Sequence, residues 1–201
     1  LKEASEKPAS DSIVQNANMD EGTMREFVSD IGSEADRLQR TTEKLLDLSR
    51  LDDGVMVEEE PVDMKQVTMD AMWLLRPIAA EKDVHVHSEL ADGCVVMATV
   101  DDIYHIVFNL AENAIKYNVP GGSVTLTLRG GDDTVEFITE DTGIGIPEEE
   151  RLNVFSRFYR VDKARSRASG GSGLGLSIVH DAVVKHGGTI TVVANKPCGT
   201  R

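Results

Sequence analysis

The chain has 201 residues, 40% of them hydrophobic, which suffices for one domain with a good core plus an appendage, or for two small domains. Its formal net charge of −14 argues against a nucleic-acid-binding surface, because phosphate backbones require clustered Lys and Arg. No apolar run approaches the ~18 residues that a membrane-spanning helix needs, and no secretory signal begins the chain. The two cysteines, Cys94 and Cys198, make no disulfide framework and are expected to be reduced thiols of a cytoplasmic protein.

The first 54 residues predict one long helix after a short polar segment. Residues 1–22 contain a proline, a glycine and several Ser and Asn, and are expected to form a helix end and a loop. "TMRE" at 23–26 fits a capping box, and apolar residues at 4-3 spacing follow it: Met24, Val28, Ile31, Ala35, Leu38 and Leu45. A helix with this stripe needs a partner helix, and its heptads favour a bundle or coiled coil over packing on its own domain.

Helices and strands are mixed from residue 55 onward. "VMVEEEPVD" at 55–63 predicts a short strand and a turn at a domain boundary. The other predicted elements are, in chain order, helix 64–82 kinked or limited by Pro77, strands 84–90 and 94–99 joined as a hairpin, helix 101–117, strands 123–130 and 134–141, helix 173–186 and strand 189–194. Tight hairpins between neighbouring strands indicate an α+β fold, a two-layer α/β sandwich with a mixed, largely antiparallel sheet covered by helices on one face.

Polar residues of an unusual kind share one face of the predicted helix 101–117. In "FNLAENAIKYN" at 108–118, helical spacing brings together Asn109, Glu112, Asn113 and Lys116, while apolar residues occupy the opposite face. A solvated helix face usually mixes Lys and Glu, and Asn is a weak helix former. The paired Asn therefore predict a ligand that requires oxygen ligands and amide hydrogen bonds.

Two glycine clusters follow this helix. "EDTGIGIP" at 140–147 places Asp141 at a strand end with Gly143 and Gly145 behind it, where glycine permits a positive φ or the close approach of a ligand. Plain turns also use this pattern. "GGSGLGLSIVH" at 170–180 opens a helix whose free N–H groups and dipole suit a phosphate, although a flexible hinge has the same composition.

The four motifs together resemble the ATP-binding domain of the sensor histidine kinases. The similar segments are "NLAENAIKY" for the N box, "DTGIG" for the first glycine box, "FSRFYR" for the F box and "GGSGLGLSI" for the second glycine box. The resemblance runs from about residue 55 to the end and implies a Bergerat-type fold, shared with DNA gyrase, heat-shock chaperone and mismatch-repair ATPases. "LLDLSRLDDG" at 45–54 resembles the end of the second helix of these kinases' dimerisation domain.

The resemblance implies a site for ATP and Mg²⁺ on helix 101–117. Asn113 would supply an oxygen to Mg²⁺, with Asn109 supporting the metal directly or through water. Lys116 would place a point charge on the phosphates, and Tyr117 would pack near the nucleotide. Asp141 would accept a hydrogen bond from the adenine amino group, a contact that guanine with its carbonyl oxygen cannot make.

The resemblance also assigns the glycine-rich segments. Gly143 and Gly145 would let the purine approach the backbone. The segment from about 146 to 172 would be a lid over the nucleotide, anchored by Phe155 and Phe158, with Arg160 a candidate for the γ-phosphate. The triphosphate would lie on the second glycine box and the first turn of its helix, at Gly171, Gly173, Leu174 and Gly175.

The implied activity is phosphoryl transfer to a histidine. Hydrolytic relatives place a Glu at position 109 to activate water, and Asn109 cannot act as that base. No His of this chain has the acceptor context of the family, and "LKEASEK" at 1–7 resembles the far end of the acceptor helix. We therefore expect a fragment that starts after the acceptor and holds no catalytic residue. The expected final strand is also absent after "GT" at 199–200, which could leave a sheet edge unpaired.

The family implies several partners for the complete protein. These are a homodimer through the dimerisation helices, a response regulator receiver domain, and an upstream sensor region that is often membrane-spanning, with this chain as its cytoplasmic portion. Two other hypotheses remain open. One is a pseudokinase with a vestigial nucleotide site, disfavoured by the intact Asn113 and Asp141; the other is a hydrolytic ATPase, disfavoured by Asn109.

Overall fold

The computed structural model describes residues 22–23, 31, 58–161 and 172–201. The chain divides into two units, residues 1–43 and 44–201, and almost every described residue belongs to the second. The predicted loop at 1–22 and dimerisation helix at 23–54 therefore lie outside the described residues, apart from Gly22, Thr23 and Ile31, which are helical. Among the described residues, no helix is long and apolar enough to cross a membrane.

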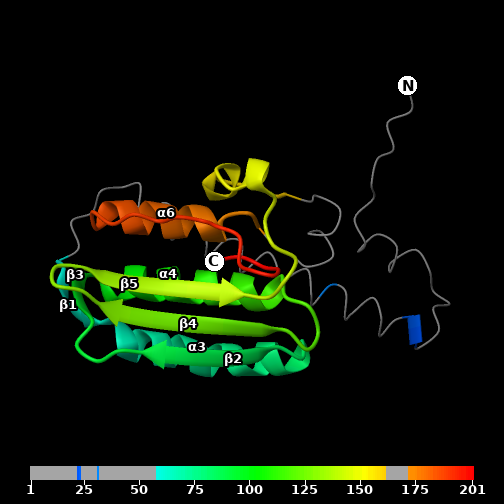
Figure 1. The fold of residues 1–201 in the computed structure, drawn as a ribbon, viewed down its shortest axis with the longest axis horizontal. Coiled ribbons are helices and arrows are strands. Elements are labelled where there is room, and N and C mark those ends of the chain that lie inside the picture. The colour runs from blue at the N-terminus through cyan, green and yellow to red at the C-terminus, as the bar shows by residue number, and fades with distance from the viewer. Residues whose placement is uncertain (1–21, 24–30, 32–57, 162–171) are drawn as a thin grey trace. The chain divides into compact units, whose positions relative to one another are not determined.

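The second unit alternates strands and helices in the predicted order (Figure 1). Its elements are β1 (Glu60–Asp63), α3 (Met64–Glu81), β2 (His85–Leu90), β3 (Val95–Ala98), α4 (Val100–Lys116), β4 (Ser123–Gly130), β5 (Val135–Asp141), the short 3₁₀ turns η1 (Glu148–Glu150) and η2 (Asn153–Phe155), and α6 (Gly175–Lys185).

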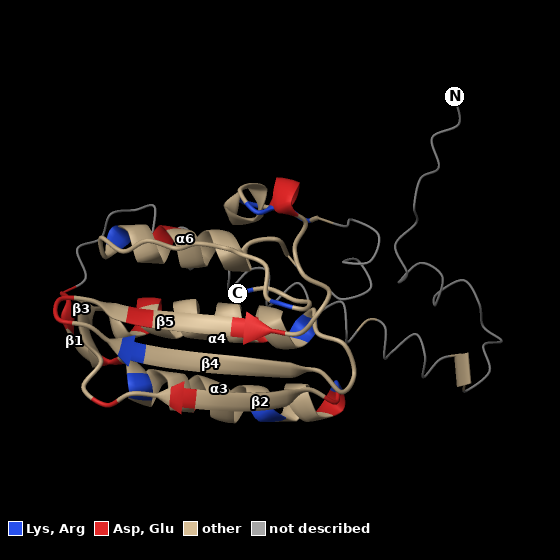
Figure 2. Ribbon diagram, in the orientation of Figure 1, with Lys and Arg blue, Asp and Glu red and all other residues tan. Residues whose placement is uncertain are grey.

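Local chemistry explains where α3 and α4 begin and end. Asp63 caps α3 by accepting a hydrogen bond from the Lys65 N–H at 2.9 Å, and α3 continues through Pro77. Thr99 caps α4 in the same way, accepting from the Asp102 N–H at 3.2 Å. Acidic residues in the first turn of α4 and Lys116 in its last turn match the helix dipole. Figure 2 shows that the charged residues of this unit lie mainly at the ends of its strands and helices.

The strands form two sheets, and this corrects one prediction. β2 pairs in parallel with β4, and β4 pairs antiparallel with β5, while β3 pairs antiparallel with β1. The predicted hairpin of strands 84–90 and 94–99 is therefore wrong, because β2 and β3 belong to different sheets. The glycine turn between them was correctly located, since Gly93 has a φ of +74°. A turn signal fixes where a chain reverses, but pairing depends on the apolar faces, and α4 returns the chain beside β2.

The core lies between the three-stranded sheet and its helices. α4 packs between α3 and α6, and α3 and α4 cover one face of the sheet (Figure 1). The inward side chains of β4, Val124, Leu126 and Leu128, are at most 1% exposed. They pack against the apolar face of α4, which consists of Ile103, Ile106, Val107, Ala111, Ala114 and Ile115. This packing buries one face of α4 and leaves the residues of its other face near the helix end for a site.

The C-terminal residues differ from the predicted strand at 189–194. Among the described residues, this segment contributes only an isolated bridge between Ala194 and Thr200. Val193 and Arg201 exchange two backbone hydrogen bonds of 2.7 and 2.9 Å, and the Asp141 N–H donates to the Thr200 carbonyl at 2.9 Å. Residues 200 and 201 thus lie between the end of β5 and Val193. Residues 189–192 have no such ladder partner among the described residues, which explains why apolar alternation alone did not produce a strand.

Candidate nucleotide-binding site

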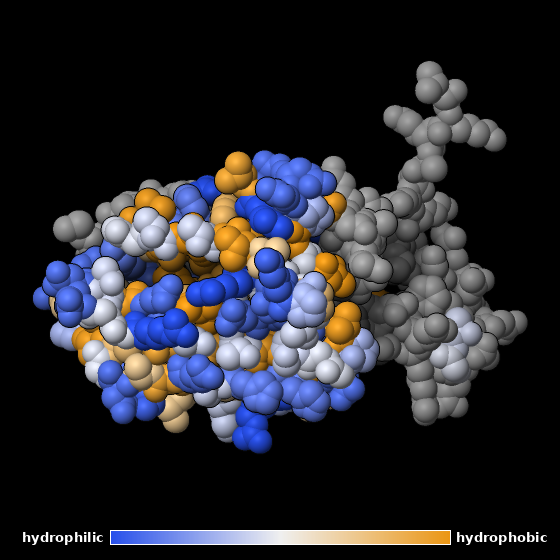
Figure 3. Space-filling model, viewed as in Figure 1, coloured by the Kyte–Doolittle hydropathy of each residue, from blue (hydrophilic) through white to orange (hydrophobic). Residues whose placement is uncertain are grey.

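The end of α4, the end of β5 and the start of α6 border one open cleft. Its volume is about 1750 Å³. The predicted site residues that line it are Asn113, Lys116, Tyr117, Asp141, Gly145, Arg160, Gly173 and Gly175. Apolar residues such as Phe137, Val183 and Ile190 line the rest, and Figure 3 shows apolar groups within a hollow on this face. The structure therefore brings three separate sequence motifs to one concave surface.

Asp141 holds a partly buried carboxylate at the end of β5. Its Oδ1 accepts a hydrogen bond of 2.8 Å from the Gly143 N–H. Burial raises the pKa of this carboxyl above its usual value, and hydrogen bonds from Gly143 and Thr200 offset only part of the effect. A carboxylate that is poorly solvated gains more than a hydrated one from an N–H donor of a ligand.

Gly143 meets the end of α4 and does not line the cleft. A Cβ at this position would lie 2.3 Å from the Tyr117 carbonyl oxygen and 2.9 Å from the Asn118 Cα. The next residue, Ile144, donates its N–H to the same Tyr117 carbonyl at 3.2 Å. The first glycine box is thus fixed against the N box by backbone contact, and that contact requires glycine. Gly145, with a φ of +71°, is the glycine of this pair that reaches the cleft.

Asn109 is buried beneath the first residue of α6. Its side chain is 5% exposed, and its Nδ2 donates to the His105 carbonyl at 2.8 Å. A Cβ at Gly175 would lie 2.8 Å from the Asn109 Oδ1, so this glycine lets α6 begin directly over the amide. Leu174 is fully buried and packs with Ile178 under α6, so its side chain does not reach the cleft either. Both residues position the helix start, whereas Asn113, one turn further along α4, lines the cleft.

Arg160 carries an unsatisfied charge at the cleft. Its Nε and one of its Nη atoms are buried and have no hydrogen-bond partner among the described residues. A buried donor without an acceptor destabilises a protein by about 1–3 kcal/mol, and more when it is charged. Its positive charge also lowers the pKa of the Tyr117 hydroxyl, although burial outweighs it and the net pKa is raised. Both nitrogens could donate to an anionic group of a ligand bound in this cleft.

The described part of the predicted lid contacts α6 through an aromatic ring and through an ion pair of 3.0 Å between the Arg157 Nη2 and the Asp181 Oδ2. Phe155 lies with its ring centroid 5.6 Å from that of His180 on α6. The ring of Phe158 is instead 62% exposed, and its φ of +64° turns it outward, so the expectation that this side chain anchors the lid is wrong. Its backbone supplies the anchor, because the Phe158 N–H donates to the Gly173 carbonyl at 2.9 Å. Gly171 lies outside the described residues.

The comparison with known proteins decides the family. Residues 98–201 match the family described as "Histidine kinase-, DNA gyrase B-, and HSP90-like ATPase". The chain belongs to this family. Both the predicted family membership and the predicted α/β sandwich are confirmed.

Sensor histidine kinases are prominent among its relatives. SenX3 of Mycobacterium tuberculosis (strain ATCC 25618 / H37Rv), a sensor-like histidine kinase, is 35% identical over 182 residues, which are 90% of this chain and 44% of SenX3. The solved mycobacterial sensor histidine kinase MprB is 35% identical, with a TM-score of 0.62 over 71% of this chain and 92% of that chain. ShkA, solved at full length in complex with AMPPNP, is 25% identical, with a TM-score of 0.74 over 96% of this chain and 40% of that chain. This chain thus spans less than half of SenX3, and it contains a catalytic ATP-binding domain of the sensor histidine kinase type.

The donor set of this ATPase-family cleft fits Mg²⁺ as an ion shared with phosphates. Among the described residues, no group of three or more His, Cys, Asp or Glu could hold a metal. Asn113 nevertheless offers a neutral side-chain oxygen at the cleft, and Mg²⁺ keeps several waters and takes charge from substrate phosphates. A site with a single amide ligand from the protein would fit such an ion.

The structure also shows site residues that the sequence reasoning missed. The end of α4 is connected to the start of β4 and the end of β5 by hydrogen bonds of Asn118, Ser123 and Thr142. The Asn118 Nδ2 donates to the Ser123 carbonyl at 2.9 Å, and the Ser123 N–H donates to the Thr142 Oγ1 at 2.8 Å. These bonds keep Asp141 next to Tyr117. The available signal was local: an Asn directly after the predicted helix end and a Thr inside the "DTG" motif.

Proposed function

We propose that the complete protein is a sensor histidine kinase in which this chain binds ATP and Mg²⁺. The kinase would transfer the γ-phosphate of ATP to a histidine outside this chain and from there to an aspartate of a response regulator receiver domain. In the first step a bond forms from an imidazole nitrogen to the γ-phosphorus, the bond from that phosphorus to the bridging oxygen breaks, and ADP leaves. The residues of this chain bind and orient the nucleotide.

The observation that carries the proposal is that one cleft holds a carboxylate acceptor at one place and positively charged groups at another. Asp141 offers a carboxylate to an N–H donor, which suits the adenine amino group. Lys116 and the unpaired guanidinium of Arg160 offer positive charge, which suits phosphates. The glycines at the start of α6 supply a helix N-terminus at the cleft, and such ends favour anions. A nucleoside triphosphate has both an amino-bearing base and an anionic end.

Mg²⁺ would be held by Asn113 together with the phosphates, and it would neutralise part of their charge. Asn109 would support the site by fixing the start of α6 above its own amide. The side chain of Asn109 is a buried amide, so it offers no base to activate water. This favours transfer to a protein side chain over steady hydrolysis by the second candidate, a hydrolytic ATPase.

The assembly of the complete protein follows from the same proposal. We infer a homodimer through the dimerisation helices, and a sensor region that is membrane-bound in the complete protein with this portion on the cytoplasmic side, where ATP is available. If the protein were instead a pseudokinase, this chain would bind the nucleotide weakly, or with an affinity that does not depend on Mg²⁺.

Labelled ATP tests the proposal on the full-length protein. Incubation with γ-labelled ATP and Mg²⁺ is expected to give a phosphoprotein that is labile in acid, as phosphohistidine is, and label should pass to a receiver domain added afterwards. The matched control is the same protein with Asp141→Asn, which should label far more slowly. Steady release of inorganic phosphate without labelled protein would favour the hydrolytic ATPase, and the absence of any acid-labile phosphoprotein would refute the kinase assignment.

A further inference from the structure

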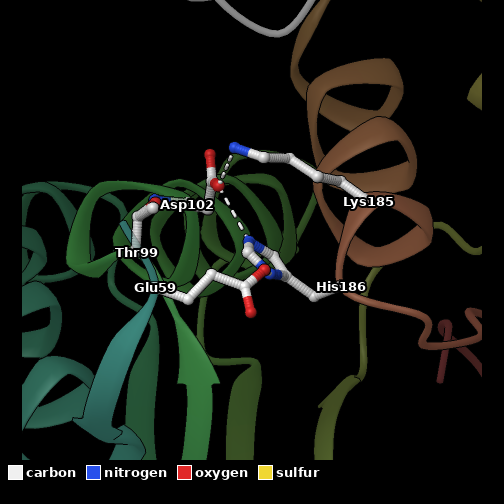
Figure 4. A network of polar contacts seen from close by, with 5 residues as sticks. All are labelled: Glu59, Thr99, Asp102, Lys185 and His186. Atoms are coloured by element: carbon white, nitrogen blue, oxygen red, sulfur yellow. Dashed lines mark hydrogen bonds and ion pairs between the residues drawn. The ribbon is translucent and has the colours of Figure 1, made fainter. Parts of the chain in front are cut away.

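A second polar cluster lies at the other ends of the two helices that border the cleft, where His186 lines the far end of the same cleft. We call it the His186 cluster; it consists of Glu59, Asp102, Lys185 and His186 (Figure 4). Asp102 belongs to the first turn of α4 and is 6% exposed. Its Oδ2 accepts from the Lys185 Nζ at 2.7 Å and lies 2.8 Å from the His186 Nε2. Lys185 ends α6 and His186 follows it, so the cluster joins the start of α4 to the end of α6.

His186 lies between two carboxylates. Its Nδ1 is 3.0 Å from the Glu59 Oε1, on the side of the ring opposite Asp102. The His186 side chain is 10% exposed, whereas that of Glu59 is 46% exposed. A neutral imidazole has one N–H, and only the protonated ring donates to both carboxylates at once. Because a buried acceptor is costlier to leave unsatisfied than an exposed one, a neutral ring should keep Asp102 and release Glu59 to water.

The charged groups that face the ring come from three segments. Glu59 precedes β1, Asp102 begins α4, and Lys185, on the same helix end as His186, reaches Asp102. Burial raises the pKa of Asp102, but hydrogen bonds from Lys185, His186 and Thr99 outweigh it and lower the pKa. Asp102 therefore stays a carboxylate as pH changes around neutrality, so it remains an acceptor for the His186 ring whether that ring is neutral or protonated.

The location of the cluster gives it access to the nucleotide site. α4 carries Asn113 and Lys116 at its far end, and α6 begins at Gly175, about 16 Å along an 11-residue helix from the cluster. Glu59, in turn, lies a few residues after the predicted end of the dimerisation helix at about residue 54. The cluster thus connects the segment that leads into this domain with both helices that hold the cleft.

We propose that His186 is a positioning residue whose protonation fastens Glu59 to α4 and α6 and so strengthens nucleotide binding at the opposite ends of these helices. The inference rests on the proposed function, because nucleotide binding is its output. When the ring is protonated, the segment before β1 is tied to the two helices and the cleft is held in its binding geometry. When the ring loses its proton, Glu59 is released, while the apolar packing of α4 on α6, the Asp102–Lys185 contact and one bond to His186 remain.

A double-mutant cycle at two pH values tests this coupling. The 201-residue chain, Glu59→Gln, His186→Gln and the double variant are titrated with a non-hydrolysable ATP analogue and Mg²⁺ at about pH 6 and about pH 8, on either side of the usual range of histidine. Near pH 6 each single variant should bind up to roughly fivefold more weakly than the parent, as for loss of a partly exposed ion pair, and the double variant no more weakly than His186→Gln. Near pH 8, Glu59→Gln should match the parent.

Matched controls and a second measurement separate this proposal from the proposed function. Glu58→Gln removes the neighbouring exposed carboxylate, and His87→Gln removes an exposed histidine of β2; both should bind as the parent does at each pH. The same cycle measured by urea unfolding does not require a nucleotide and should show coupling between Glu59 and His186 near pH 6 only. If the folded parent binds no nucleotide, the proposed function fails. The role of His186 would be overturned if Glu58→Gln and Glu59→Gln changed nucleotide affinity equally. It would also be overturned if the coupling free energy between Glu59 and His186 were the same at both pH values.

Discussion

Replacing Asp141 by Asn should stabilise the fold and weaken adenine binding at the same time. The two side chains have the same shape, and the Asn Oδ1 can still accept the 2.8 Å hydrogen bond from the Gly143 N–H. The amide nitrogen then takes the place of the other carboxylate oxygen. It presents N–H donors where the adenine amino group also presents donors, so the contact is lost.

The magnitudes follow from the state of the carboxylate. A hydrogen bond to a charged acceptor contributes about 1.5–3 kcal/mol, so the affinity for an ATP analogue should fall by roughly 10- to 150-fold. Burial raises the pKa of Asp141 in the folded chain above its unfolded value. The protonated carboxyl therefore stabilises the folded state at pH values below the unfolded pKa. This stabilisation is lost as pH rises from the unfolded pKa through the raised folded pKa. At neutral pH the ionised Asp141 lowers the free energy of unfolding, and Asn removes this penalty.

Two measurements on the 201-residue chain check the reasoning. Calorimetric titration gives the affinity, and urea unfolding at acid and neutral pH gives the stability. The variant should be more stable than the parent at neutral pH, and the difference should shrink at acid pH, where Asp141 is protonated. A variant that binds the ATP analogue as tightly as the parent would refute the adenine contact. A variant that is less stable at neutral pH would refute the account of the buried charge.

Three further variants test other contacts of the site. Gly143→Ala should lower the free energy of unfolding by about 1–3 kcal/mol in urea unfolding, because the added Cβ would lie 2.3 Å from the Tyr117 carbonyl oxygen and the backbone must shift. Arg160→Met should weaken binding of an ATP analogue but leave ADP binding nearly unchanged in calorimetry, since the unpaired guanidinium is assigned to the γ-phosphate; equal losses for both nucleotides would contradict that assignment. Asn113→Ala should abolish the gain in affinity that Mg²⁺ gives the parent, as measured by paired titrations with Mg²⁺ and with chelator, and an undiminished Mg²⁺ effect would place the metal elsewhere.

The residues of the cleft could be predicted from the sequence because they belong to four recognisable motifs that occur in the order typical of one family. Paired Asn on a helix with one apolar face favour a polar ligand, and a glycine cluster at a helix start suits a phosphate. The structure brings Asn113, Asp141 and Arg160 to one surface, although Asn113 and Arg160 are 47 positions apart in the sequence. Helix periodicity predicted only that the polar residues of α4 share a face, and the resemblance of four motifs in order to the sensor histidine kinases assigned Asp141 and Arg160 to the same site.

The errors arose where tertiary contacts decide the outcome. Asn109 shares a face with Asn113 and is buried because α6 begins directly over it; no local pattern reveals that contact, and the role of Asn109 at Mg²⁺ stays a prediction. Phe158 points outward because its backbone adopts a positive φ, which is rare for a bulky residue and has no signature in the sequence. The partner of β3 was also misassigned, since a turn shows that the chain reverses but not which edge it joins. The His186 cluster joins residues 59, 102 and 186. These residues are far apart in the sequence, and helix and strand periodicity predicts only contacts between residues of one element.

The measurement that tests the central claim most directly is a calorimetric titration of the 201-residue chain with a non-hydrolysable ATP analogue, with and without Mg²⁺, beside the corresponding GTP analogue. The account predicts binding at one site, strengthened by Mg²⁺ and selective for adenine over guanine. A chain that is shown to be folded yet binds neither nucleotide, or binds both equally well, would contradict the assignment of Asp141 and of the cleft as an ATP site.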